Sequence, residues 1–191
     1  MDKKANTKYK INDLLENRWS PRAFSEKEIE TEKLQRIFEA ARWSPSSANS
    51  QPWRFIIGIK GRGDSYNKIL TCLNESNQAW AKFAPVLVVN CGEKMFRDME
   101  MGTFKYDVGQ SVAYMTIQAT SKGLFLHQMA GFSHSKIRET FGLSKNVEPI
   151  AVMTLGYLGK PDMLPEFQKE RERITFNFWG VTSIMQINFQ V

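Results

Sequence analysis

The chain has few of the residues that most metal and thiol chemistry requires. Its 191 residues include two histidines and two cysteines. Cys72 and Cys91 match no metal or dithiol spacing, so we expect reduced thiols. His127 and His134 have no acidic or cysteine neighbour at ligand spacing, and no serine stands in a nucleophile elbow. The sequence therefore predicts no metal site and no catalytic triad.

Long apolar runs are also missing. The first six residues, Met1-Asp2-Lys3-Lys4-Ala5-Asn6, lack the apolar segment of a signal peptide, and no stretch reaches the length of a membrane span. There is no repeat, low-complexity tract or long linker. We expect a cytoplasmic protein that forms one domain over residues 1–191, without a membrane partner.

Acidic residues are outnumbered by basic ones, 20 to 26, and the formal net charge of +6 favours an anionic partner. Basic and acidic residues are interspersed, as in Glu170-Arg171-Glu172-Arg173, so nucleic acid is not the expected partner. A dinucleotide fingerprint that starts at Gly61 fails, because Tyr66 replaces its third glycine. Phosphorylated small molecules account for the positive charge equally well.

Helical and strand patterns alternate along the chain. Ser25-Glu26-Lys27-Glu28 has the spacing of a capping box, and it precedes an apolar helical stripe that Pro45 ends. Further helices are predicted over 8–17, 64–73, 104–122 and 133–141, and strands over 54–60, 85–91 and 150–158. This order indicates an α/β or α+β fold.

Two polar segments are candidates for a binding site. Arg18, Ser20 and Arg22 occupy alternate positions beside a proline that disfavours helix, so an extended chain would point them to one side. Two guanidinium groups and a hydroxyl suit a phosphate. The loop Pro45–Trp53 is bracketed by prolines and offers small polar side chains to a ligand. Each segment alone is equally compatible with an ordinary solvated surface.

Together, these segments resemble the FMN-dependent nitroreductase family. Residues 12–24 resemble its opening R-x-S-x-R-x-F element, and further matching segments follow in the family's order up to residue 180. They are the segments 45–53, 80–89, 107–109, 127–132, 171–173 and 179–180. The resemblance implies an α+β fold with a mixed central β-sheet flanked by helices, and a homodimer with FMN at its interface.

The resemblance also implies which residues bind FMN. Arg18, Ser20, Arg171 and Arg173 would hold the phosphate, and Arg22 would lie nearer the N1 and O2 edge of the flavin. The backbone of Gln128 to Gly131 would face N5. Many relatives have a glutamate where Ala130 stands, which leaves the polar contacts of the substrate open. The remaining candidates from the same segments, and from a loosely aligned asparagine, are Trp19, Pro45, Ser46, Ser47, Asn49, Asn77 and Met129.

The implied activity is a ping-pong relay that needs no catalytic side chain. NADH or NADPH would pass hydride to flavin N5, and an electron-poor small molecule such as a nitroaromatic or a quinone would then be reduced. Two alternatives stay open. One is a non-catalytic module that binds or senses FMN, and the other is a specialised FMN reductase or dehalogenase of the same fold.

The C-terminal stretch 181–191 has no obvious place in a single domain. Its apolar residues Met185, Ile187 and Phe189 alternate, so an extended arm could lie across a second subunit. A frayed or edge-strand tail explains the same pattern.

Overall fold

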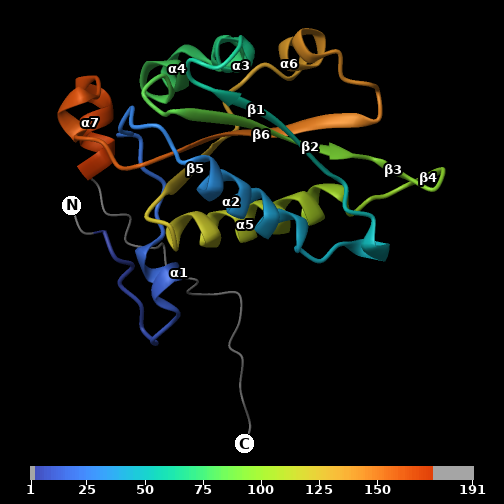
Figure 1. The fold of residues 1–191 in the computed structure, drawn as a ribbon, viewed down its shortest axis with the longest axis horizontal. Helices are drawn as coiled ribbons and strands as arrows, with labels where there is room; N and C mark the ends of the chain where they lie inside the picture. The colour runs from blue at the N-terminus through green and yellow to red at the C-terminus, as the bar shows by residue number, and fades with distance from the viewer. Residues whose placement is uncertain (1–2, 174–191) are drawn as a thin grey trace, which may run out of the picture.

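A computed structural model describes residues 3–173 as a four-stranded sheet between two layers of helices (Figure 1). In spatial order the strands are β1 (Trp53–Ile59), β2 (Val86–Glu93), β6 (Val147–Gly156) and β5 (Phe125–Met129), and β3 (Met95–Phe96) and β4 (Met99–Glu100) form a separate hairpin. The helices are α1 (Asp13–Asn17), α2 (Thr31–Arg42), α3 (Ser65–Cys72), α4 (Glu75–Ala81), α5 (Phe104–Thr120), α6 (His134–Phe141) and α7 (Glu166–Arg173). Single 3₁₀ turns occur at Ser47–Asn49 and Pro161–Met163.

The α+β class is confirmed, but the sheet formed by residues 3–173 is antiparallel and not mixed. All three of its strand pairs are antiparallel. Ile59 at the end of β1 lies beside Val86 at the start of β2, so the connection through α3 and α4 leaves and re-enters at the same end of the sheet. A parallel pair would require a crossover to the opposite end.

Successive side chains along each strand point to opposite faces of the sheet, so one apolar core forms on each face. On one face, α3, α4 and α6 cover Leu87, Val89 and Cys91 of β2. On the other, α2 and α5 cover Val86 and Val88. Figure 1 shows these two helical layers above and below the sheet. In the described part of the chain, no helix combines the length and apolarity needed to cross a bilayer.

The two edge strands separate the predicted binding segments. β1 is one edge and follows the loop 45–52, while β5 is the other edge and precedes residues 130–132. The segment before α2 lies at the β5 side, since Phe24 bridges Leu158 and Nδ1 of His127 lies 2.8 Å from the Pro21 carbonyl. In Figure 1 this N-terminal segment lies beside α7, at the opposite side of the molecule from the loop.

Two predicted helices begin later than the sequence suggested. The backbone N–H of Ser25 donates to the Tyr157 carbonyl at 2.9 Å, which ties this segment to the end of β6 as an extended chain. The capping-box pattern therefore does not start a helix, and α2 begins at Thr31. The first helix was predicted over 8–17, but only Asp13–Asn17 is helical, because the Asn12 side chain caps it by accepting from the Leu14 N–H.

Candidate functional site

The segment from Arg18 to Phe24 presents alternate residues to solvent and to the core. Arg18 is extended, with φ −75° and ψ 126°. Arg18 and Ser20 are exposed, whereas Pro21, Ala23 and Phe24 are buried. The Trp19 ring meets Phe125 of β5 edge to face, with ring centroids 6.0 Å apart. The core side of the segment is thus fixed, and Arg18 and Ser20 remain accessible to a ligand.

Helix α7 is attached to this segment by one buried carboxylate. The side chain of Glu172, with 2% of its surface exposed, accepts from the Arg22 N–H at 3.0 and 3.1 Å and from the Ala23 N–H at 3.1 Å. These partners lie about 150 positions apart in the sequence. The contact brings the two predicted arginine-containing segments together, as the neighbouring blue and orange-red ribbons in Figure 1 show.

Positive charge accumulates around this contact. Burial lowers the pKa of Arg22, and the nearby charge of Arg171 lowers it further, while Glu172 opposes the shift. Lys3 also lies here: its Nζ donates to the Glu172 carbonyl and lies 4.3 Å from the centroid of the Trp19 ring. Its pKa is lowered mainly by burial. Arg22 thus interacts with the charges of Lys3, Arg171 and Glu172, which makes three cations to one carboxylate, and this excess of positive charge favours an anion.

His127 links the same segment to β5. Its ring lies 4.5 Å from the Trp80 ring, centroid to centroid. Because a carbonyl can only accept, Nδ1 must carry the proton and donate to Pro21. Burial lowers the pKa of His127 to about 4, with a smaller contribution from the Arg22 charge, against hydrogen bonding to Pro21 and Ser20. The imidazole is therefore neutral at pH 7 and serves as a fixed hydrogen-bond donor.

The end of β5 leads into a tightly packed turn at Gly131. The Gly131 carbonyl accepts from the Asn74 N–H at 3.0 Å and from Nδ2 of Asn77 at 3.1 Å. A Cβ at position 131 would lie 2.3 Å from Nδ2 of Asn74 and 2.7 Å from Nδ2 of Asn77, so only glycine fits. Gln128 and Ala130 are exposed, while Met129 points into the core.

Three non-glycine residues of the 45–52 loop have a left-handed backbone. The φ angles are 51° at Ala48, 51° at Asn49 and 46° at Gln51, a region in which such residues are strained. Two contacts hold this shape. The Ser46 hydroxyl accepts from the Gln51 N–H at 3.0 Å, and the Asp107 carboxylate accepts from the Ser47 N–H at 3.2 Å.

Asp107 itself is buried, with 2% of its surface exposed, near the start of α5. It also accepts from the Thr103 hydroxyl at 3.3 Å. The loop is consequently anchored to α5, and Ser47 and Asn49 are exposed at its tip.

Within one chain, the predicted site residues form two separate groups. Arg22, Arg171 and the segment 128–131 lie on the β5 side, together with Asn77 through its contact with Gly131. The loop residues Pro45, Ser46, Ser47 and Asn49 lie beyond the opposite edge strand. The backbone of Arg173 ends α7, and residues 174–191, which include Trp179-Gly180 and the predicted arm, lie outside the described residues.

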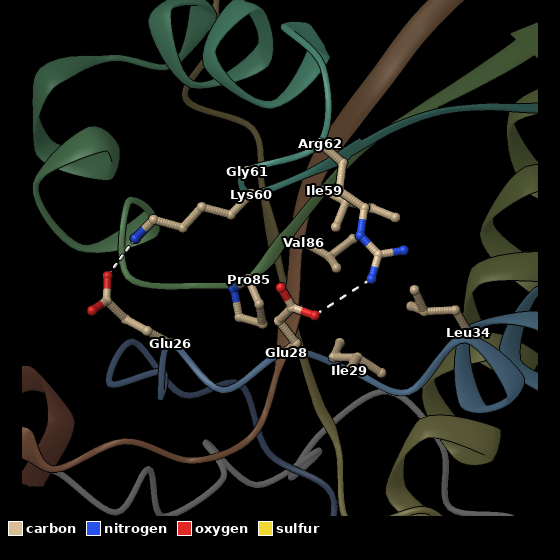
Figure 2. Close-up of a pocket in the computed structure, with 10 residues that line it drawn as sticks. All are labelled: Glu26, Glu28, Ile29, Leu34, Ile59, Lys60, Gly61, Arg62, Pro85 and Val86. Atoms are coloured by element: carbon tan, nitrogen blue, oxygen red, sulfur yellow. Dashed lines mark hydrogen bonds and ion pairs between the residues drawn. The ribbon is translucent and has the colours of Figure 1, made fainter.

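A cleft of about 280 Å³ lies at the far end of β1 from the loop. Figure 2 shows two ion pairs across it, Glu26 with Lys60 and Glu28 with Arg62, the second at 3.4 Å. No predicted site residue lines this cleft. Because its cations already face carboxylates, it does not offer the unbalanced positive charge that a phosphate requires.

Little in the sequence pointed to the roles of Lys3, Glu172, His127 and Asp107. Glu172 stands in an alternating run of acidic and basic residues that is typical of a solvated surface. His127 was considered as a metal ligand or a triad residue and as part of the matching segment 127–132, but not as a donor to the Pro21 carbonyl. For Asp107 a signal existed, because its position in the first turn of a long helix favours an acidic residue. Its role in holding the loop depends on tertiary structure.

Comparison with known proteins shows which proteins this chain is similar to. The model of the nitroreductase family matches residues 15–98. An uncharacterised 15.4 kDa protein of Mycolicibacterium smegmatis is 31% identical over 125 residues, which are 62% of this chain and 84% of that protein. A Xanthomonas oryzae protein, provisionally named NADH dehydrogenase/NAD(P)H nitroreductase, is 24% identical over 75% of this chain and 82% of its own length.

Solved structures extend the similarity to nearly the whole chain. An oxidoreductase containing FMN is 29% identical, with a TM-score of 0.84 over 94% of this chain and 95% of that one. A nitroreductase family protein from Clostridium difficile 630 is 27% identical, with a TM-score of 0.68 over 90% of this chain and 97% of that one. The chain belongs to the nitroreductase family and has its fold.

Proposed function

We propose that this chain is an FMN-dependent oxidoreductase that takes electrons from NADH or NADPH and reduces an electron-poor small molecule. The observation that carries the proposal is the convergence of Arg22 and Arg171 beside the end of β5, around the buried carboxylate of Glu172. Similarity to an oxidoreductase containing FMN and to proteins named NAD(P)H nitroreductase supports it.

The chemistry of the side chains fits FMN. A phosphate monoester carries a charge of −1.5 to −2 at pH 7, and the surplus of positive charge around Glu172 has the matching sign. Arg18, Ser20, Arg171 and Arg173 would bind the phosphate, while Arg22 would face the N1 and O2 edge. The backbone at Gly131, held by Asn74 and Asn77, would face the reactive N5 side of the ring.

The chemistry that bound FMN supplies is acceptance of hydride from NAD(P)H and its transfer to an acceptor such as a quinone or nitroaromatic. This chain's own residues contribute position and charge. A cation at Arg22 favours a negative charge on the edge of the reduced flavin ring. The packing of Gly131 against Asn74 and Asn77 holds the backbone of this turn in place.

We also propose that the working form is a homodimer. The loop residues Ser46, Ser47 and Asn49 lie at the wrong sheet edge to reach the Arg22 side of their own chain. A second copy could supply them. The outer face of α5 is suited to such a contact: Tyr106 and Tyr114 are 72% and 46% exposed, and no residue from 108 to 120 is charged. Surface helices normally present charged residues to water.

The experiment begins with the visible absorption spectrum of the purified protein. We expect a flavin spectrum that disappears under anaerobic NADH or NADPH and returns when menadione or a nitroaromatic is added. Initial rates at several acceptor concentrations should give parallel double-reciprocal plots. A protein that neither carries nor takes up FMN contradicts the proposal. One that binds FMN without oxidising NAD(P)H is a binding module.

A further inference from the structure

Glu172 occupies a position that a carboxylate rarely takes. It is almost fully buried, and both of its oxygens are directed at the backbone N–H groups of Arg22 and Ala23. Burial of a charge is unfavourable unless the charge is paired and hydrogen-bonded. Two backbone N–H groups meet this requirement, with three contacts of 3.0–3.1 Å to a charged acceptor.

The rest of α7 offers little other attachment. Its sequence, Glu-Phe-Gln-Lys-Glu-Arg-Glu-Arg, contains one apolar residue, Phe167, which is 55% exposed. One turn before Glu172, the buried Gln168 donates from Nε2 to the Ser76 carbonyl at 3.4 Å. Residues four apart share one helix face, so α7 is docked by two polar side chains and not by an apolar stripe.

Arg171 is placed by this docking. Arg171 directly precedes Glu172 in α7. Because Glu172 contacts the Arg22 backbone, Arg171 lies near enough to Arg22 for their charges to interact. Two adjacent guanidinium groups repel each other, so they do not hold α7 in place themselves. Of the contacts that hold α7, those of the Glu172 carboxylate are the ones made directly to the Arg22 segment.

We infer that Glu172 is a positioning residue for the cofactor phosphate. It holds α7 against the Arg22 segment, so that Arg171 from one part of the chain and Arg18 and Ser20 from another face the same phosphate. The inference rests on the proposed FMN site and adds a role for a residue that contacts the protein backbone and not the cofactor.

Charge alone and position predict opposite effects of Glu172 on the affinity for FMN. A carboxylate near a phosphate repels it, so removal of the Glu172 charge would tighten binding of FMN if charge were its only influence. If position dominates, removal of the charge should weaken binding of FMN. The sign of the change therefore separates the two roles.

The test compares FMN with riboflavin, which lacks the phosphate. The full chain is stripped of flavin, and both ligands are titrated by flavin fluorescence against wild type, Glu172→Gln and the matched control Glu170→Gln. Glu170 is exposed on the same helix. Loss of charged hydrogen bonds should weaken FMN binding by Glu172→Gln roughly ten- to a hundred-fold. Riboflavin affinity should change less than about three-fold, and Glu170→Gln should behave as wild type.

Two further variants keep the result interpretable. Glu172→Asp retains the charge but withdraws the carboxylate by one methylene group, and it should also lose preference for FMN. In an Arg171→Ala background, Glu172→Gln should cause little further loss, because the two residues act as one unit. Equal weakening of FMN and riboflavin, or tighter FMN binding, overturns the inference while the FMN site stands. Wild type that does not prefer FMN to riboflavin overturns both.

Discussion

The neutral, half-buried His127 gives a quantitative prediction for acid stability. Its pKa is about 4 in the folded chain, against about 6.5 for an unperturbed histidine. Between these values the unfolded chain binds a proton that the folded chain does not, so acidification favours unfolding. The contribution of His127 to stability is complete above about pH 6.5 and is lost as the pH falls towards 4.

The size of this effect follows from the difference between the two pKa values. At about 1.36 kcal/mol per pH unit, the full difference corresponds to roughly 3 kcal/mol, of which about 2.5 kcal/mol is lost by pH 4.5. His127→Asn removes the titrating ring and retains a donor near the position of Nδ1, which bonds the Pro21 carbonyl. The substitution also loses packing against Trp80, which lowers stability at every pH.

Urea denaturation at a fixed protein concentration, at four pH values from 7.5 to 4.5, measures the difference. Wild type should lose roughly 2.5 kcal/mol more than His127→Asn over this range. The matched control is His134→Asn, the same change at an exposed histidine, and it should follow wild type. Parallel stability curves for wild type and His127→Asn would refute a lowered pKa for His127.

Three other substitutions test the packing around the site and the proposed dimer interface. Gly131→Ala introduces a Cβ 2.3 Å from Nδ2 of Asn74, so unfolding by urea should show a loss of about 1–3 kcal/mol; unchanged stability would contradict the close packing. Asp107→Asn replaces the carboxylate that accepts from the Ser47 N–H, so the free energy of unfolding in urea should fall by about 1.5–3 kcal/mol. An unchanged urea midpoint would contradict this role of Asp107. Ala113→Lys places a charge on the outer face of α5 and should give monomers in sedimentation, whereas Asn67→Lys on α3 should not; a dimeric Ala113→Lys would exclude that face.

Local sequence predicted most elements where local forces decide them. Helix α6 begins after Ser133, which accepts from the Lys136 N–H, and it ends at Gly142 with φ 58°, as the sequence pattern suggested. The buried strand β2 was likewise found from its run of valine and leucine. In both cases the signal and the structure lie within a few residues of each other.

Prediction failed where distant segments meet. Ser25 has the pattern of a helix cap, but its N–H is already bonded to Tyr157 at the end of β6. Strand β5 was missed because it is short, and α4 because its seven residues give too little periodicity. Asn77 was assigned to the flavin by resemblance alone, and that assignment stays a prediction; the contact of its amide with the Gly131 carbonyl was not foreseen. These outcomes depend on tertiary contacts that no local pattern encodes.

The candidate site was only partly accessible from sequence for the same reason. The alternation of Arg18, Ser20 and Arg22 indicated that their side chains share one face, but it did not indicate which other segment lies beside that face. The meeting of Arg22 with Arg171 could be expected only from resemblance to a family. The carboxylate that brings them together has no sequence signature, because Glu172 resembles its solvent-exposed neighbour Glu170 until the chain folds.

The bond between Glu172 and the Arg22 backbone also has a consequence for the order of folding. Its partners lie about 150 positions apart in the sequence, and contacts of such long range need the intervening chain to be ordered, so they form late. Helix α7 has few apolar contacts of its own, and elements of this kind are the first to detach in local unfolding. A nascent or partly unfolded chain can therefore have both cores complete and still lack its phosphate-binding residues in one place. FMN would then bind only after α7 has docked on the Arg22 segment. Because FMN binds this docked form, excess flavin would shift the equilibrium between detached and docked α7 towards the docked form.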